Sequence, residues 1–521
     1  MKKLNVTLAF WVALLAVMII VLCALIFSNK FESITGTIRD DIIRGAGWFY
    51  LLTIMVLVGV CIFLLISPIG KIRLGDPDSR PTYSTVSWIA MLFSAGMGIG
   101  LVFYGAAEPL SHYAVMAPEA ETYSRQALLD AFKYSFFHYG IHAWAIYAIV
   151  ALAIAYFQFR KKESTLFSVT LKPLFGNTMD GKVGKLVDSL TIFATVIGVA
   201  TSLGSGALQI NSGINNLFGV PYNFTVQLII IIVATGLFMT SALSGLDKGV
   251  KTLSNLNMII AVILMIIAFI MGPSVKIMNT FTETIGAYLQ DFLRMSARTG
   301  AGDADQQAWI NKWTMFYWSW WLAWSPFVGI FIARISKGRS IREFVSCVLF
   351  VPSLFSFLWF SVFGVLSTSA LESNLELAKK PFETLLFETF DYYPLSGVLS
   401  IAAILLVFSF FITSADSATF VLAMQSQHGS LHPSNKIKVI WGVLVSAIAA
   451  VLLRAGGLDA LQNVLIIVAL PFSIMLVLIV ISLMKELSYE RQQMGLYIKP
   501  KRYPDKDSPF RSYETDDDSD E

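Results

Sequence analysis

Five of the twelve tryptophans in this chain lie in one short segment, WTMFYWSWWLAWSPF, which begins at residue 313. On a helix, one stripe of this segment is made by Trp313, Tyr317, Trp320 and Trp324. Trp320, Trp321 and Trp324 lie one to two turns deeper than an interfacial belt, a role that suits Trp309, Trp313 and Trp318. Indole faces with no acid beside them in sequence suit a cation that donates no hydrogen bonds, such as quaternary ammonium. The deeper three predict a ligand surface, with packing as the alternative.

A second aromatic patch lies in the segment HYGIHAWAIY. Tyr139 and Tyr147 share one helical stripe, and Trp144 lies about 60° from it. His138 and His142 lie on the other side, and we interpret both as packed polar residues because no second metal ligand follows at a useful spacing. The aromatic residues of this segment therefore extend the predicted cation surface.

Hydroxyl groups gather in the segment FFITSADSATF, which surrounds Asp416. Sodium prefers several hard oxygen ligands, and these hydroxyls could provide them together with carbonyls freed by a broken helix. Hydroxyl bonding back to the same helix is the alternative. Asp416 is an intramembrane acid and hence a functional candidate, but pairing with a basic residue would explain it equally, so its role is left open.

Composition places the chain in a membrane. It is 56% hydrophobic and 14% charged, whereas soluble domains are about 25% charged. A net charge of only +3 gives no electrostatic footprint for a nucleic-acid partner. The chain has no Walker A, HExxH or GxSxG motif, so we expect no enzyme and no nucleotide hydrolysis. The three isolated cysteines suggest neither a metal site nor a disulfide.

Apolar runs of about 20 residues predict about twelve membrane helices, centred near residues 18, 57, 97, 146, 200, 235, 262, 323, 356, 405, 446 and 474. Most of the 38 Lys and Arg residues then fall on the side of the termini, which predicts that both termini are cytoplasmic. Residues 277 to 298 suit an amphipathic helix on the outer surface. The tail from about Arg491 is polar, and we expect its last part to be disordered.

Two of the predicted helices carry interruptions. One contains SAGMGIG, with Gly96, Gly98 and Gly100, and the other contains WSPFVG, where Pro326 removes a backbone donor. They lie five helices apart and therefore run in opposite directions. This arrangement is typical of inverted repeats with a site between them, although glycines at this spacing also serve close helix packing.

Four motifs, GMGIG, HAWAIY, WTMFYWSWWLAWSPFVGIFIARISKGRSIREF and TSADS, resemble the betaine/choline/carnitine transporter family, particularly its bacterial glycine betaine carriers. The resemblance covers nearly the whole membrane portion. It implies an all-α polytopic protein in the bacterial cell membrane, with a LeuT-type inverted 5+5 repeat preceded by two extra helices, usually as a homotrimer. The expected parts are two helices and a loop (1–85), repeat 1 (86–272), an outer amphipathic helix and loop (273–311), repeat 2 (312–485) and a cytoplasmic tail (486–521).

The resemblance also implies a substrate site. The trimethylammonium group is expected in a box of Trp144, Tyr147, Trp320, Trp321 and Trp324, with Tyr139 where relatives often have tryptophan. The segment with Gly96, Gly98 and Gly100 is expected to approach the substrate carboxylate through its backbone. Choline carriers similar to this family tend to have an acid at the position of Gly100, so glycine favours glycine betaine.

Sodium is the expected coupling ion, and no other cofactor is implied. A first sodium is expected among the carbonyls of Ser94, Met97 and Phe410 and the hydroxyls of Thr413 and Ser414. A second is expected among Thr195, Ser202 and Phe327. Sodium-independent carnitine exchangers resembling this family carry an arginine on the fifth helix, and this chain has none there between Ser189 and Gly213.

The leading hypothesis is therefore sodium-coupled import of glycine betaine for osmoprotection by alternating access. Alternatives keep the carrier but change the substrate to choline, carnitine, ectoine or proline, or change the coupling ion to a proton. A receptor or channel for quaternary amines is the hypothesis from a different class. The expected partners are the small substrate, sodium, membrane lipid and further copies of the chain. The short tail gives no support for osmotic activation.

Overall fold

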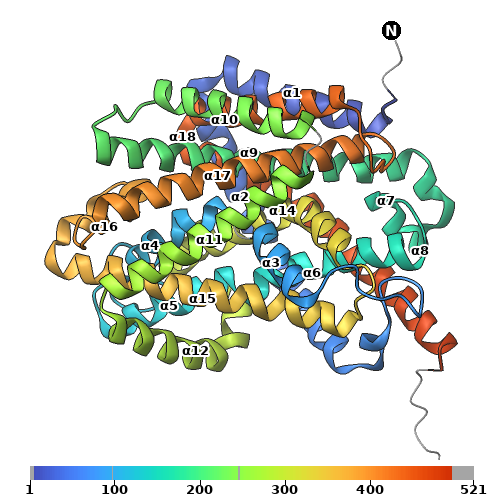
Figure 1. Ribbon diagram of the computed structural model, residues 1–521, viewed down its shortest axis with the longest axis horizontal. Coiled ribbons are helices and arrows are strands. Elements are labelled where there is room, and N and C mark those ends of the chain that lie inside the picture. Colours follow the sequence, from blue (N-terminus) through green and yellow to red (C-terminus); the bar gives the residue numbers. More distant parts are fainter. Residues whose placement is uncertain (1–4, 97, 245–246, 496–521) are drawn as a thin grey trace, which may run out of the picture.

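The computed structural model describes residues 5–96, 98–244 and 247–495, which form helices joined by loops (Figure 1). These described residues contain no strand, and one isolated bridge pairs Arg73 with Ser340. Within them, nine helices are long and apolar enough to cross a membrane. The longest, α18 (Asn435–Gln493), counts once although non-helical backbone at Gly456 and Gly457 divides it. The prediction of an all-α polytopic membrane protein is confirmed.

The long helices and helix pairs contain or adjoin every predicted centre. They are α1 (Leu8–Ile26), α2 (Ser28–Ile66), α3 (Thr85–Gly96) with α4 (Ile99–Ala114), α5 (Arg125–Tyr139) with α6 (Ile141–Ala155), α9 (Lys182–Phe218), α10 (Phe224–Ser244), α11 (Asp247–Met271), α14 (Thr314–Ile335), α15 (Ile341–Ser373), α17 (Ser396–Ser426) and α18. Shorter helices lie at the ends of this bundle: α7 (Phe167–Thr170), α8 (Lys172–Phe175), α13 (Ala304–Lys312) and α16 (Leu385–Phe390).

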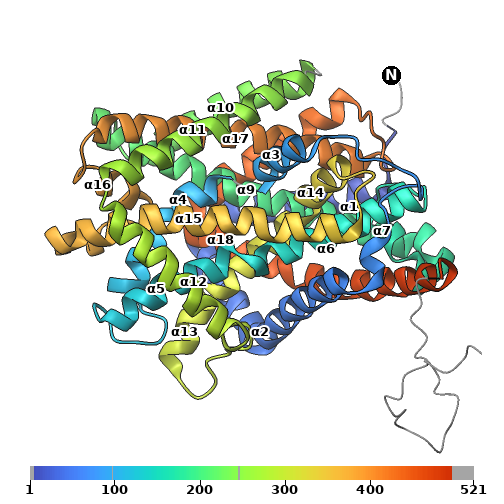
Figure 2. The same ribbon diagram turned by 60° about the horizontal axis from the view of Figure 1, so that its bottom comes forward.

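Both ends of the described chain lie at one face of the molecule. The backbone N–H of Thr7, just before α1, donates to the carbonyl of Ser426 at the end of α17 (2.9 Å). Arg160, which follows α6, pairs with Glu490 near the end of α18 (2.5 Å). Figures 1 and 2 both show α7 and the red end of α18 on the side away from α16. We refer to these sides as the terminal face and the opposite face.

The third predicted span is interrupted where its glycines predict. α3 ends at Gly96 and α4 begins at Ile99. Gly98, between them, has an extended backbone with φ −137° and ψ −163°. Met97 lies outside the described residues. The interruption lets the chain present backbone, rather than a continuous helix, to its neighbours.

The predicted break at Pro326 is wrong, because α14 runs from Thr314 to Ile335 with the proline inside it. Proline has no N–H, so the carbonyl of Leu322, four residues earlier, loses its helical donor. The hydroxyl of Ser325 donates to that carbonyl instead (2.8 Å). Only one of the two expected interruptions therefore exists, and the inverted repeat stays a prediction from the family resemblance.

The predicted amphipathic segment is the helix α12 (Ser274–Ser296), which packs against α5 and α15. Ile277 and Tyr288 are buried on one side of it, whereas Leu289 and Leu293 are exposed on the other. At the far end of the chain, α18 continues through Arg491, so helical structure extends into the predicted polar tail. The part of the tail expected to be disordered lies outside the described residues.

We predict that Ser325→Ala lowers the free energy of unfolding by about 1 kcal/mol, because it leaves the buried Leu322 carbonyl without a donor. Thermal unfolding of the purified protein in detergent measures the effect. Ser361→Ala is the matched control. Ser361 is a buried helical serine whose hydroxyl donates to the Phe357 carbonyl (2.8 Å), but that carbonyl also keeps its helical donor, the backbone N–H of Ser361. Equal losses in the two variants would contradict the compensating role of Ser325.

Candidate binding site

The interruption before α4 places glycine backbone directly against the tryptophans of α14. A Cβ atom added at Gly100 would lie 2.6 Å from Cη2 of Trp320, and one added at Gly98 would lie 3.1 Å from Cη2 of Trp324. The first distance is shorter than real Cβ contacts allow. Glycine is therefore required at position 100 for this approach of backbone to indole, and the site forms where the two helices meet.

The three deeper tryptophans have their indole N–H groups bonded to the protein. Trp320 Nε1 donates to the hydroxyl of Ser202 (3.0 Å). Trp321 Nε1 donates to the carbonyl of His138 (2.8 Å), and Trp324 Nε1 donates to the carbonyl of Gly198 (2.9 Å). These bonds to α9 and α5 fix the orientation of the rings. Because these N–H groups already donate to the protein, a ligand can contact only the faces and the other edges of the rings.

The rings from α5, α6 and α14 surround a single cavity. Trp320 and Trp321 lie parallel, with ring centroids 5.3 Å apart and planes 3° apart, and the ring of Tyr139 meets Trp321 edge-on at 5.1 Å. Trp144 and Tyr147 meet edge-on at 5.5 Å. The cavity is lined by Gly98, Gly100, Leu101, Tyr139, Ala143, Trp144, Tyr147, Trp320, Trp321, Trp324 and Ser356. The structure thus brings together all six aromatic residues predicted for the box.

Among the described residues, the lining of the cavity consists of aromatic rings, small residues, Leu101 and Ser356. Its residues include no acid, no base and no thiol. Tyr139 Oη donates to the carbonyl of Gly100 (3.1 Å), while the buried Oη of Tyr147 has no partner among the described residues. Nothing in the lining can act as a nucleophile with an adjacent base. The aromatic faces of the described lining can hold a cation.

Part of the first predicted sodium site comes together on α17. The hydroxyl of Thr413 lies 3.3 Å from the carbonyl of Phe410 and also donates to the carbonyl of Ser409 (3.1 Å). Asn257 of α11 donates its Nδ2 to the Thr413 hydroxyl (3.3 Å), and its buried Oδ1 has no partner among the described residues. Ser414 follows, half-buried. Asn257 was not predicted, because an isolated asparagine in an apolar helix carries no motif.

The remaining predicted ligands of that site are on the glycine segment. Met97 lies outside the described residues, and Ser94 lies in α3. Asp416, whose role was left open, accepts a hydrogen bond from the hydroxyl of Ser241 on α10 (2.5 Å). The full ligand set for a first sodium therefore stays a prediction.

The second predicted sodium set is dispersed among other contacts. Ser202 accepts the indole N–H of Trp320. Thr195 donates to a carbonyl of its own helix, and the ring of Phe327 packs edge-on against Trp324 at 5.3 Å. No contact among the described residues joins Thr195, Ser202 and Phe327. This second site stays a prediction, while Ser202 has an observed role in orienting Trp320.

The outer tryptophans do not form the predicted interfacial belt. Trp309, Trp313 and Trp318 are 1%, 6% and 1% exposed, so they lie inside the protein. Trp318 stacks on His142, with planes 19° apart. His142 Nε2 also pairs with the hydroxyl of Ser296 (2.7 Å), which confirms it as a packed polar residue. These tryptophans cover polar groups that position alone did not reveal.

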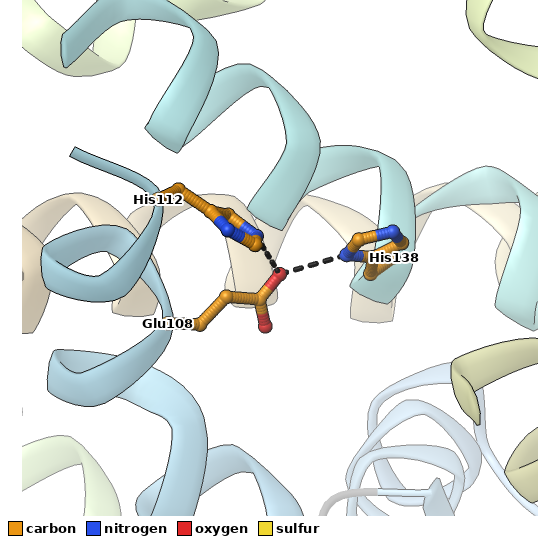
Figure 3. Close-up of side chains that lie close together, drawn as sticks. All are labelled: Glu108, His112 and His138. Atoms are coloured by element: carbon orange, nitrogen blue, oxygen red, sulfur yellow. Dashed lines mark hydrogen bonds and ion pairs between the residues drawn. The ribbon is translucent and has the colours of Figure 1, made fainter. Parts of the chain in front are cut away.

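His138 is a packed polar residue as predicted, but the expectation that no other metal-type ligand lies near it is wrong. It belongs to a buried cluster with Glu108 and His112, whose ligand-type atoms all lie within 4.8 Å of one another (Figure 3). Glu108 and His112 are four residues apart and therefore share a face of α4. That spacing is a signal in the sequence, whereas the position of His138, 26 residues beyond His112, carries none.

Known proteins are similar to this chain over nearly its whole length. The family model described as betaine/carnitine/choline family transporter matches residues 8–492. The glycine betaine transporter OpuD of Bacillus subtilis is 53% identical over 94% of this chain and 96% of its own length. The ectoine/hydroxyectoine transporter of Virgibacillus pantothenticus is 43% identical over 92% and 96%. A glycine betaine/proline/choline transporter of Vibrio parahaemolyticus is 37% identical over 92% and 90%.

We predict that Gly100→Ala displaces Trp320 and destabilises the folded protein by about 1–3 kcal/mol, as overpacked cores do. The midpoint of thermal unfolding, followed by tryptophan emission, measures both effects. Gly236→Ala in α10 is the control, since a Cβ there meets nothing within 4 Å. Unchanged stability and emission in Gly100→Ala would show that the backbone and Trp320 separate without cost.

Proposed function

Because the chain belongs to the betaine/carnitine/choline transporter family, it is a membrane transporter of small osmolytes, and we propose that it imports glycine betaine by sodium symport. The function of transport, rather than catalysis, agrees with a cavity that lacks reactive groups. The proposed process is alternating access, in which the cavity between α4, α6 and α14 opens to one face of the membrane at a time. Uptake of a compatible solute in this way would serve osmoprotection.

The aromatic cavity is the single observation that carries this proposal. Trimethylammonium donates no hydrogen bonds, and the indole N–H groups of Trp320, Trp321 and Trp324 are already bonded to the protein. What the rings offer is a set of faces, each worth about 0.5–2 kcal/mol towards a desolvated cation. A primary ammonium ion would find no acceptor among the side chains of the three tryptophans.

The start of α4 suits the carboxylate end of a betaine. Gly98 precedes the first turn of α4, and no side chain caps that helix. The first N–H groups of a helix have no internal partner and favour a nearby anion. An acid at position 100 would oppose a carboxylate there, and its Cβ would also collide with Trp320. Glycine betaine is therefore favoured over choline, which has no carboxylate.

The proposed sodium ion has a partial ligand set near α17. Phe410 and Thr413 supply oxygens 3.3 Å apart. The Oδ1 of Asn257, which has no partner among the described residues, is a further hard oxygen beside them. Sodium binding at this place would give the buried Asn257 Oδ1 a partner and so offset the free-energy cost of its desolvation. Ser94, Met97 and Ser414 complete the first proposed site, and Thr195, Ser202 and Phe327 form the second.

We further propose the arrangement expected for the family. Residues 86–272 and 312–485 form the two repeats, preceded by residues 1–85, separated by 273–311 and followed by a cytoplasmic tail at 486–521. Both termini face the cytoplasm, so the terminal face is the inner one. The working assembly is a homotrimer in the bacterial membrane. α12, which keeps Leu289 and Leu293 exposed, is available for contacts with neighbours or lipid.

We expect purified protein in liposomes to accumulate labelled glycine betaine above its external concentration when a sodium gradient is imposed. Saturable binding without accumulation would instead support a receptor or channel. Trp324→Leu removes one aromatic face and should raise KM about tenfold, from a loss of about 1–2 kcal/mol. Trp48→Leu is the control, because Trp48 is 56% exposed on α2, away from the cavity. An unchanged KM in Trp324→Leu would remove the box from the proposal.

We expect uptake to stop when potassium replaces sodium on both sides. Thr413→Val removes a proposed ligand, so it should raise the sodium concentration for half-maximal uptake at least several-fold while the protein stays folded. Thr240→Val is the matched control, since Thr240 is a helical threonine that bonds only to a carbonyl of its own helix α10 among the described contacts. Uptake that persists without sodium would refute symport but not transport. Competition by choline, carnitine, ectoine and proline ranks the substrates.

A further inference from the structure

A second polar centre lies next to the aromatic cavity, on the side of the opposite face. It contains Glu108 and His112 of α4 and His138 of α5, which lie close together (Figure 3), and also Tyr317 of α14. All four side chains are buried. His138 Nδ1 lies 2.8 Å and His112 Nε2 lies 3.2 Å from the same carboxyl oxygen of Glu108. Tyr317 donates to the other carboxyl oxygen. One carboxyl group therefore joins three helices.

This centre is in direct contact with the cavity wall. The ring of Tyr317 stacks on Trp320 with planes 20° apart and on Trp321 with planes 19° apart. Since α14 runs from the opposite face towards the terminal face, Tyr317 lies one turn above the box. A ligand that entered the box from the opposite face would have to pass the layer in which Glu108 lies. In the structure the Glu108 side chain is fully buried, so this layer is closed to water.

The hydrogen bonds of the two histidines differ. Trp309 Nε1 donates to His112 Nδ1 (3.3 Å), so a neutral His112 carries its proton on Nε2 and donates to Glu108. This geometry works against a metal ion, because a metal would need the Nε2 lone pair while Nδ1 carried a proton towards the Trp309 N–H. The cluster thus contains residue types that bind metal ions. Its hydrogen bonds, however, place a proton on His112 Nε2 towards Glu108, where a metal ion would need a lone pair.

His138 is adjustable where His112 is fixed. Its two ring nitrogens face Glu108 Oε1 and the hydroxyl of Thr314 (3.1 Å). When Glu108 is a carboxylate, Nδ1–H donates to it and Nε2 accepts from Thr314. When Glu108 carries a proton, Glu108 donates to Nδ1 and Nε2–H donates to Thr314, since a hydroxyl both donates and accepts. The cluster can therefore gain one proton without losing a hydrogen bond.

We propose that the Glu108, His112, His138 and Tyr317 cluster is a proton-binding site that fills when the route from the opposite face closes over the aromatic box. The proposal rests on the proposed function in taking the box as the substrate site and the opposite face as the external one. Proton uptake converts Glu108 from charged to neutral at the moment that it leaves water. External acidity then favours the closed state and raises the external substrate concentration needed for uptake.

The charges around the cluster support this direction. Among the described residues, the only ion-pair partners of Glu108 are the two histidines, so no permanent cation compensates a buried carboxylate. An uncompensated charge is costly inside a membrane protein, and a bound proton removes it. The titratable groups that act on the cluster from the surrounding elements are Tyr104, Tyr139, His142 and Lys312, with Glu383 and Asp459 acting on Tyr104 from farther out.

The position of the site also limits its role. A proton that drives transport must be released on the side to which the substrate is delivered. This site lies between the box and the opposite face, so its proton returns to the side from which it came. The proton therefore regulates access and does not supply energy for import.

The test measures uptake of labelled glycine betaine by the full-length protein in liposomes, at external pH 5.5 to 8.0 with internal pH and sodium fixed. The external KM of the wild type should rise as pH falls, by at most tenfold per pH unit, the limit for one proton. Glu108→Gln is permanently neutral and should show a high KM that does not vary with pH. Glu108→Gln with the pH dependence of the wild type would overturn the proposal, as would a wild type without any dependence.

Two further variants serve as a control and as a second test of the proton site. Glu119→Gln is the matched control, because Glu119 is a carboxylate near the same face that pairs with Arg294 (2.7 Å), and it should keep the pH dependence of the wild type. Thr314→Val removes the partner that lets His138 reverse its donors, so its KM should rise only at a lower pH than in the wild type. This variant decides the question if Glu108→Gln fails to fold, and an unshifted curve counts against the proposal.

A metal ion is the competing occupant. If micromolar zinc raised the external KM, if EDTA abolished the pH dependence, and if His112→Gln removed both effects, the cluster would be a metal site and the proposal would fail. A KM curve that EDTA leaves unchanged supports the proton.

Hydrogen exchange separates the two proposals. Without substrate, and after correction for intrinsic rates, α4 and α5 of the wild type should be more protected at pH 5.5 than at pH 8.0, and those of Glu108→Gln should not differ. Such protection without betaine uptake would refute the proposed substrate and keep the proton site. Uptake with equal protection at both pH values would refute the proton site alone.

Discussion

The close approach of the Gly98 to Gly100 backbone to the indoles of Trp320 and Trp324 is the constraint on which the site depends. It requires the interruption between α3 and α4, since a side chain at position 100 would overlap Trp320. It also requires that the rings stay in place, which the bonds to Ser202 and Gly198 ensure. Two turns farther along α4, Glu108 meets His138 and Tyr317.

Much of this site follows from local sequence, for an identifiable reason. Aromatic residues at helical spacing share a face, and consecutive glycines weaken a helix, so Trp320, Trp324 and the interruption at Gly98 were predictable. Composition and the length of the apolar runs predicted the polytopic all-α fold in the same way. These features depend on backbone periodicity and on solvent, which a sequence displays directly.

The errors concern interactions between side chain and backbone or between distant helices. Pro326 predicted a break, but Ser325 supplies the lost hydrogen bond, and that compensation depends on a rotamer. Trp309 was expected at the membrane interface, but it covers His112. Asn257 meets Thr413 across two helices that are far apart in sequence. Spacing within a segment cannot reveal such partners, because tertiary packing selects them.

Because the indole N–H groups are already bonded, the aromatic box and the proposed sodium site favour different cations. Sodium holds its water through the oxygen atoms, and a cavity of ring faces cannot replace that shell, so entering the box would cost its hydration. Trimethylammonium binds water weakly and loses little by entering. The hydroxyl and carbonyl oxygens of Phe410 and Thr413 offer the reverse exchange. Substrate and proposed coupling ion would thus be sorted by how strongly each is hydrated, without a gate that distinguishes their charge.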